Sequence, residues 1–244
     1  MIRLTAFLLP TEFCDSDNFQ IDTWAQMIIR GRGRKNPIEQ AKLIKEWVQC
    51  HIKYRADFRN IKASETLSKG FGQCSNRANL QIAFLRILKV PAGYAIVGIK
   101  KELFKSTSPP EFYERISQPT THVYCVVYDT KFERWRHFDL LPHLTLYRAL
   151  QKIGKAELRS HNSEGESKYK SEYLASEICI HSNIDHLFKV PPRWLNEEYI
   201  KKANRYLKNL EKENLEKKNL EKGELKSSFE WKMLSPNPSG SCPK

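Results

Sequence analysis

The 244-residue sequence has few glycines and prolines, no long apolar run and no closely spaced cysteines. Ten glycines and 12 prolines exclude a collagen-like repeat. Its apolar stretches fall short of the roughly 18 residues that a membrane-spanning helix needs. The absence of a Cys-x-x-Cys pair excludes zinc ribbons, thioredoxin-type redox motifs and iron–sulfur runs. With 40% hydrophobic residues, the chain has enough apolar side chains for the core of one sizeable domain.

The six cysteines are spread along the chain, and the closest two are 24 residues apart. This spacing is not that of a disulfide scaffold, so we expect a reducing compartment in which most of the thiols are small buried hydrophobes. The apolar residues 4–10 lack a small-residue cleavage pattern after them, which disfavours a secretory signal. The sequence therefore predicts a cytoplasmic protein. The cysteines are Cys14, Cys50, Cys74, Cys125, Cys179 and Cys242.

The net charge is +13, from 41 Lys and Arg against 28 Asp and Glu. An excess of this size is typical of proteins that meet nucleic acid, an anionic membrane surface or an acidic partner. Residues 201–244 hold 11 basic and 6 acidic side chains, so they carry +5 and the rest of the chain +8. Only residues 30–35 form a dense basic cluster, and no zinc knuckle, RNA-recognition signature or helix-turn-helix accompanies it. The positive charge is therefore distributed along the chain, and nucleic acid is not a favoured partner.

Hydrophobic periodicity predicts helices first and strand-like runs after them. Asp22 is the expected N-cap of the first helix, and Asn36, Pro37 and Glu39 together mark the start of the second. Residues 101–121, with three prolines, form a long connection of the kind that shapes a pocket. We expect helices over residues 22–29, 37–54, 74–88, 144–158 and 193–210, strands over residues 94–99, 122–128 and 134–138, and a polar loop over residues 161–170.

The end of the chain differs in composition from the rest. An Asn-Leu-Glu-Lys repeat begins at Asn209, Asn214 and Asn219. Leucines five residues apart rotate by about 140° per step around a helix, so they form no single apolar face that could be buried. The sequence therefore predicts a folded domain over residues 1–200 and a charged, low-complexity tail over residues 201–244.

Three residues carry the chemistry: Cys74 at the start of a predicted helix, His122 at the start of one strand and Asp139 at the end of the next. A thiolate is the reactive form of cysteine, and a helix N-terminus favours the anion and offers backbone N–H groups to an oxyanion. A histidine serves as base and then as acid, and a carboxylate fixes the orientation of its ring. A hairpin turn at residues 129–133 would bring the histidine and the carboxylate side by side.

These residues stand within an ordered set of motifs, Gly70-Phe-Gly-Gln-Cys74, Val90-Pro-Ala-Gly-Tyr-Ala95, His122-Val-Tyr124 and Trp135-Arg-His-Phe-Asp139. The set resembles the transglutaminase-like superfamily over roughly residues 20–142. The resemblance implies an α+β fold with a papain/transglutaminase-like core, in which the nucleophile helix packs on an antiparallel sheet. It also implies Cys74 as nucleophile, His122 as base and acid, and Asp139 as the residue that orients the histidine.

Three neighbours of this set, Gln73, Arg77 and Tyr124, are candidates for oxyanion or substrate binding. Gln73 completes a Gly-Gln-Cys that is similar to that of calcium-dependent transglutaminases. Arg77 is either a surface charge or a group that holds a substrate carboxylate. Tyr124 stands where the family often has Trp, and Asp139 is followed by Leu-Leu in place of the usual Pro-Thr, so the family's substrate preference is not carried over.

No cofactor or metal is assigned from the sequence. His137 with His143, and His181 with His186, lack Cys or carboxylate companions at metal-ligand spacing. An Asp-x-Asp-x-Asp-Gly calcium loop is also absent.

The leading functional hypothesis is acyl transfer through a thioester on Cys74, which forms or exchanges amide bonds on a small-molecule, peptide or carrier-bound substrate. The same residues would serve a cysteine protease or amidase, in which water takes the acyl group. A basic, non-catalytic binding protein is the alternative from another class. The oligomeric state is left open.

Overall fold

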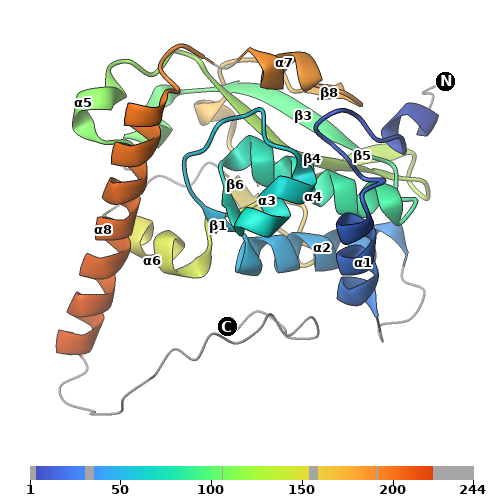
Figure 1. Ribbon diagram of the computed structural model, residues 1–244, viewed down its shortest axis with the longest axis horizontal. Coiled ribbons are helices and arrows are strands. Elements are labelled where there is room, and N and C mark those ends of the chain that lie inside the picture. Colours follow the sequence, from blue (N-terminus) through green and yellow to red (C-terminus); the bar gives the residue numbers. More distant parts are fainter. Residues whose placement is uncertain (1–3, 31–35, 106, 154–158, 191, 222–244) are drawn as a thin grey trace.

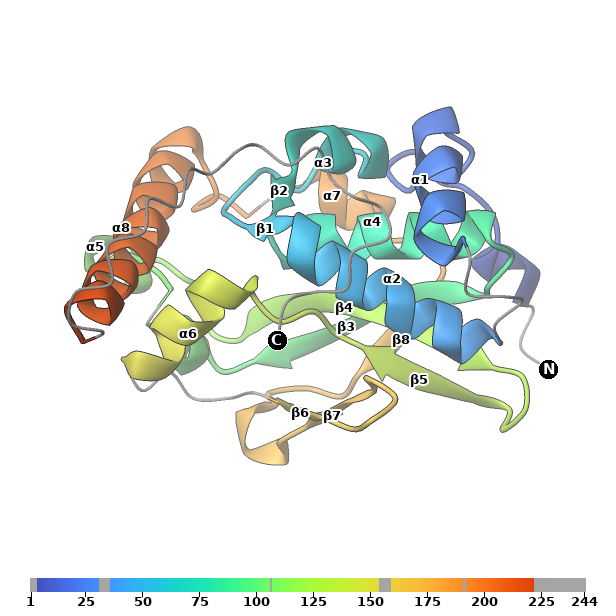
Figure 2. The same cartoon turned by 90° about the horizontal axis from the view of Figure 1, so that it is seen from below.

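The computed structural model describes residues 4–30, 36–105, 107–153, 159–190 and 192–221. A four-stranded antiparallel sheet in the order β5-β4-β3-β8 lies at its centre (Figure 1). Helices α2 and α4 cover one face of the sheet, and the β6–β7 hairpin lies on the opposite side (Figure 2). The predicted α+β fold, with the nucleophile helix packed on an antiparallel sheet, is confirmed. The elements are η1 (Leu4–Phe7), α1 (Phe19–Ile29), α2 (Pro37–His51), β1 (Lys53–Tyr54), α3 (Ala63–Lys69), β2 (Phe71–Gly72), α4 (Cys74–Ile87), β3 (Ala92–Ile99), η2 (Lys101–Phe104), α5 (Pro110–Tyr113), β4 (Thr120–Asp129), β5 (Arg134–Phe138), α6 (Leu144–Lys152), β6 (Arg159–His161), β7 (Ser167–Tyr169), η3 (Ser171–Tyr173), β8 (Cys179–His181), α7 (Asp185–Lys189) and α8 (Glu197–Glu221).

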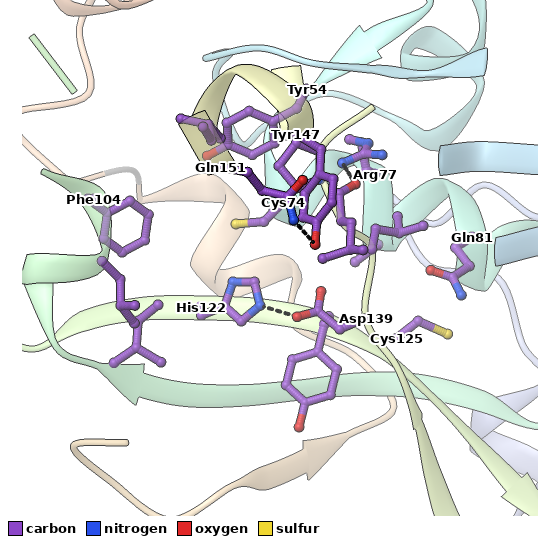
Figure 3. A pocket seen from close by; sticks show the side chains of 18 residues that line it. Tyr54, Cys74, Arg77, Gln81, Phe104, His122, Cys125, Asp139, Tyr147 and Gln151 are labelled. Carbon is purple, nitrogen blue, oxygen red and sulfur yellow. Dashed lines mark hydrogen bonds and ion pairs between the residues drawn. The ribbon is translucent and has the colours of Figure 1, made fainter. Parts of the chain in front are cut away.

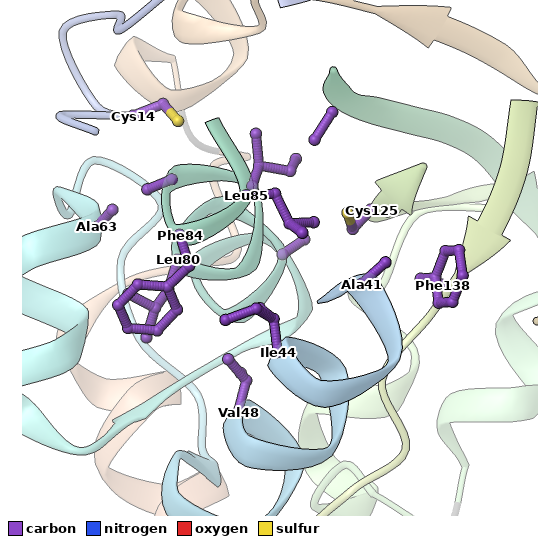
Figure 4. Packing of buried hydrophobic residues seen from close by; sticks show 14 of the residues in the cluster. Cys14, Ala41, Ile44, Val48, Ala63, Leu80, Phe84, Leu85, Cys125 and Phe138 are labelled. Carbon is purple, nitrogen blue, oxygen red and sulfur yellow. The ribbon is translucent and has the colours of Figure 1, made fainter. Parts of the chain in front are cut away.

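Helix α4 is held on every side, which fixes the position of Cys74 at its first turn. Leu80 and Phe84 of this helix are fully buried, as are Ile44 and Val48 of α2. Phe138 of the sheet belongs to the same cluster (Figure 4). Burial of each such side chain contributes about 1.5–3 kcal/mol to stability. A side chain at the end of so tightly packed a helix moves little relative to the sheet.

The first two helices test the predicted helix starts. Asn36 caps α2 as expected, since its side-chain oxygen accepts a hydrogen bond from the Glu39 N–H at 2.9 Å. The prediction of Asp22 as the first cap is wrong. Asn18 caps α1 instead, and the Asp22 N–H already bonds to the Asn18 carbonyl within the first turn. Of the predicted basic cluster, residues 31–35 lie outside the described residues.

The predicted polar loop over residues 161–170 is wrong, because this segment contributes to two strands, β6 and β7, that pair antiparallel. Buried cations hold the connection between them: Arg136 of β5 pairs with Glu164 and Glu166, and the Lys45 Nζ donates to the Gly165 carbonyl at 2.7 Å. The hairpin is positioned by ion pairs and not by an apolar stripe, so hydrophobic periodicity does not reveal it. Its strand β7 reaches the neighbourhood of Asp139.

The predicted boundary at residue 200 falls inside helix α8. Ala203 and Leu207 are buried, and Asn204 exchanges two hydrogen bonds with the Ala56 backbone at 2.8 and 2.9 Å. Arg55 forms a two-pronged ion pair with Glu211 at 2.9 and 2.6 Å. The buried face begins upstream of the repeat and continues to its first leucine, Leu210, which packs against Leu146, Leu150 and Leu207, so the spacing of the repeated leucines does not predict it. Neither α8 nor any other helix in the described ranges is long and apolar enough to cross a membrane, and residues 222–244 lie outside them.

The cysteines within the described residues are of four kinds. Cys14 and Cys125 are buried free thiols, as predicted, and Cys179 is an exposed one. Cys74 is a half-buried free thiol. The expectation of free thiols does not hold for Cys50, which is disulfide-bonded.

Candidate active site

The fold brings together the three residues singled out for chemistry (Figure 3). Cys74 is the first residue of α4, and His122 lies near the start of β4. Asp139 directly follows β5, whose last residue Phe138 pairs with Cys125, three residues along β4 from the histidine. The His122 Nε2 donates a hydrogen bond to the Asp139 Oδ2 at 2.8 Å. The predicted proximity of histidine and carboxylate through the β4–β5 hairpin is therefore confirmed.

Cys74 and His122 shift each other's pKa in opposite directions. Burial by itself raises the pKa of the Cys74 thiol, but the hydrogen bond and the charge of His122, together with the Val123 backbone and Arg59, outweigh it and hold that pKa below its ordinary value. Burial by itself lowers the pKa of His122, whereas Asp139 and Cys74 raise it to about 9. Because Nε2 is taken by the carboxylate, Nδ1 is the ring nitrogen left for the sulfur. Both shifts favour the thiolate–imidazolium form of the pair.

Tyr169 of β7 is a contact of the site that the sequence did not indicate. Its hydroxyl donates to the Asp139 Oδ2 at 2.7 Å, the same oxygen that accepts from His122. Ser167, two residues earlier, accepts the Asp139 backbone N–H at 3.1 Å. The carboxylate is thus held from the histidine side and from the hairpin side. The alternation of Ser167 and Tyr169 is the one feature of the sequence here that is consistent with a strand.

We predict that Tyr169→Phe slows acylation of Cys74 about tenfold, in line with the loss of one hydrogen bond to a charged group. The carboxylate that loses this donor holds the imidazolium proton more tightly, so the pKa of His122 rises. Histidine NMR titration measures this shift, which a merely structural role would not produce. Tyr173→Phe removes the same hydroxyl from a neighbour in the same cluster and serves as control. An unchanged acylation rate in Tyr169→Phe contradicts the positioning role.

Tyr124 supports the histidine ring from one face. It is buried, and its ring lies nearly parallel to that of His122, with centroids 5.6 Å apart and an interplanar angle of 24°. Its hydroxyl pairs with the His137 Nδ1 at 2.8 Å. Burial lowers the pKa of His137, which favours a neutral ring that accepts this bond. The hydroxyl of Tyr124 is therefore bonded to His137, and the ring is the part of Tyr124 that contacts His122.

Gln73 and Arg77 also line the site, and each donates a side-chain hydrogen bond to a backbone carbonyl. The Gln73 Nε2 donates to the Asp57 carbonyl at 2.7 Å. The interpretation of Arg77 as a surface charge is wrong, because its side chain is almost completely buried and its Nη1 donates to the Leu141 carbonyl at 3.0 Å. This bond fixes the loop after Asp139 against helix α4.

The backbone at the start of α4 offers hydrogen-bond donors beside the sulfur. The first turn of a helix has N–H groups without partners in the helix, and Cys74 is the first helical residue. The Gln73 N–H is taken by the Asn76 side chain at 3.1 Å. A Cβ at Gly72 would lie 2.7 Å from the Asn76 Cβ, so this close approach requires glycine. The Cys74 N–H is placed to meet a developing oxyanion.

Two pockets meet at Cys74 and share Tyr54 and Phe104. The first encloses about 960 Å³ with its open mouth included and contains His122 and Asp139. The second encloses about 590 Å³ on the same basis. Residues 101–121 contribute to both pockets, as the sequence predicted. Apolar side chains of the first pocket include Ile99, Leu103, Leu140, Leu141, Pro142 and Leu150, and the second pocket is lined by Thr107, Ser108, Thr120 and Thr121 and by Trp194 and Tyr199.

Comparison with known proteins places part of the chain in a family. Residues 22–140 match the model of the transglutaminase-like superfamily, so the resemblance seen in the motifs is confirmed. The chain is also similar to the crystal structure of a candidate cysteine protease from Cytophaga hutchinsonii, with 22% identity and a TM-score of 0.43. That similarity covers 56% of this chain and 41% of the other, so the chain spans less than half of that protein's length. Among curated proteins, none matches the chain.

Proposed function

We propose that the transglutaminase-like domain of this chain catalyses acyl transfer through a thioester on Cys74. The donor is an amide or thioester, on a small molecule, a peptide or a carrier, and the acceptor is an amine. The observation that carries the proposal is the thiolate–imidazolium pair of Cys74 and His122, oriented by Asp139, where two pockets meet.

The first half of the reaction makes the acyl-enzyme. The Cys74 thiolate attacks the carbonyl carbon, a C–S bond forms, and the carbonyl oxygen takes up the negative charge beside the Cys74 N–H. The intermediate collapses as the bond to the leaving amine or thiol breaks. His122 gives the proton of its Nδ1 to that leaving group, which leaves the ring neutral.

The second half returns the enzyme to its starting state. An acceptor amine attacks the thioester carbonyl, and neutral His122 takes the proton that the amine loses. The C–S bond then breaks and the thiolate–imidazolium pair is restored. If water takes the place of the amine, the same steps give a carboxylic acid and the enzyme is an amidase. The second pocket favours transfer, because an acceptor bound there reacts at a high effective concentration.

The partition of the acyl-enzyme between amine and water tests this proposal. We expect that acetyl-enzyme made with p-nitrophenyl acetate gives N-acetyl product with members of a panel of primary amines, and that amide formation saturates with amine concentration. Saturation indicates a bound acceptor. Release of acetate alone with every amine, or an amide yield that rises without saturation, would favour the amidase alternative.

A further inference from the structure

Arg59 is the charged side chain of the second pocket. It lies in the segment between β1 and α3, is half-buried, and shares the pocket lining with Cys74 and Gln73. Among the residues that the structure describes, no Asp or Glu lines this pocket. The rest of its polar lining is mainly hydroxyl groups and the Gln73 amide, whose Nε2 is already bonded to a carbonyl.

The neighbouring cationic side chains form ion pairs, whereas Arg59 forms none with the described residues. Arg55 is paired with Glu211, and Lys69 with Asp57. Among the described residues, no carboxylate or carbonyl receives a hydrogen bond or ion pair from Arg59. Burial lowers the pKa of its guanidinium, and the charge that acts in the other direction is the Cys74 thiolate. An arginine stays protonated under such conditions, so the pocket contains a cation whose counter-ion is the nucleophile itself.

This pairing fails when the enzyme is acylated. Formation of the thioester removes the negative charge of Cys74, and Arg59 is left half-buried without a counter-ion. A partly desolvated charge without a partner is unfavourable. A carboxylate that enters with the substrate supplies a counter-ion to Arg59 and can accept two parallel hydrogen bonds from the guanidinium.

We infer that Arg59 binds a carboxylate of the substrate in the second pocket, so that the acceptor amine accommodated there also carries an acid group. This inference rests on the proposed function, because the second pocket is a substrate site only if Cys74 is the nucleophile. It names the chemical class that the family resemblance does not supply. Arg59 acts here as a specificity residue that contacts substrate.

Matched thiol reagents test the inference without a known substrate. Iodoacetate and iodoacetamide differ by one carboxylate, and N-(2-carboxyethyl)maleimide and N-ethylmaleimide repeat the comparison with a longer reach. The rate of modification of Cys74 is measured by mass spectrometry for each reagent, and the ratio of acid to neutral reagent is formed. The thiolate fraction affects both reagents of a pair equally and cancels in the ratio.

We expect Arg59→Gln to lower this ratio about tenfold in at least one pair, the effect of one charge at close range. Arg59→Lys keeps the charge but loses the fork of donors, and its ratio should fall in between. If Arg59→Gln folds poorly, the ratio measured for Arg59→Lys still tests the inference. Arg193→Gln removes the same charge from an exposed position and should leave the ratio unchanged, which separates a local contact from the general field of the basic chain.

The outcomes distinguish this inference from the proposed function. If Cys74 reacts fast but both ratios in the Arg59 variants stay within about twofold of the wild-type values, the assignment of Arg59 is overturned and the thiol chemistry stands. An equal fall of the ratio in Arg193→Gln overturns it as well. If Cys74 of the wild-type protein reacts no faster than Cys179 with the neutral reagents, the proposed function fails and the inference fails with it.

Discussion

We expect Cys74→Ala to abolish the proposed acyl transfer. With p-nitrophenyl acetate the wild-type chain should release a burst of about one equivalent of nitrophenol as Cys74 is acylated, and the variant should show no burst. Removal of the nucleophile from a triad of this kind costs on the order of 10⁶-fold in turnover, because the remaining binding groups cannot form the covalent intermediate. Stopped-flow absorbance measures both the burst and the later turnover.

The matched control for this prediction is Cys179→Ala. Cys179 is an exposed free thiol on β8, and neither pocket includes it. Its removal should leave the burst intact. A burst of the same size in Cys74→Ala would mean that another nucleophile is acylated, and it would contradict the assignment.

His122→Ala should slow alkylation of Cys74 by iodoacetamide at pH 6 about 100-fold or more. His122 supplies the hydrogen bond and charge that hold the pKa of Cys74 below its ordinary value, and without them the burial that raises this pKa is largely unopposed. A thiol with an ordinary pKa of about 8.5 is roughly 0.3% thiolate at pH 6. The expected loss is therefore large at acid pH and shrinks as the pH rises toward the pKa of the variant's thiol.

The pH dependence is the informative part of this prediction. The wild-type imidazolium persists until the pH approaches the His122 pKa of about 9, so the charge that favours the thiolate is present throughout the neutral range. His181→Ala removes an exposed histidine of β8 and should leave the profile unchanged. If His122→Ala and the wild-type protein react equally fast at pH 6, the thiolate does not depend on the histidine.

The central part of the fold and the proximity of His122 and Asp139 could be predicted because their signals are local. Gly72 and Cys74 mark the entry to a helix, and the β4–β5 turn brings His122 and Asp139 together through a short connection. Each of these features depends on a few residues that are adjacent in the sequence. Strand register and helix caps then fix the relative positions of these side chains closely enough for hydrogen bonds to form between them.

Tyr169 and Arg59 escaped prediction because their roles depend on long-range packing. Tyr169 reaches Asp139 only because buried Arg136 fixes the β6–β7 connection. Arg59 becomes a pocket residue because α8, more than 130 residues later in the chain, supplies Tyr199 and Leu207 to the same pocket. Neither relation has a periodicity or spacing that a sequence displays.

Helix α8 also changes the expected division of the chain. Its charged composition indicates a solvated tail, but its buried face meets the segment before Cys74 through Asn204 and Glu211. It thus adds a wall to the second pocket from outside residues 22–140, the part that matches the superfamily. We therefore expect the substrate range to depend on residues that lie beyond the family domain.

The most direct test of the central claim is peptide mapping of the full chain after reaction with p-nitrophenyl acetate and an acid quench. The account predicts a single acetyl group in thioester linkage on Cys74, which disappears when a primary amine is added before the quench. Acetylation that spares Cys74 and falls on lysines or on Cys179 would contradict it.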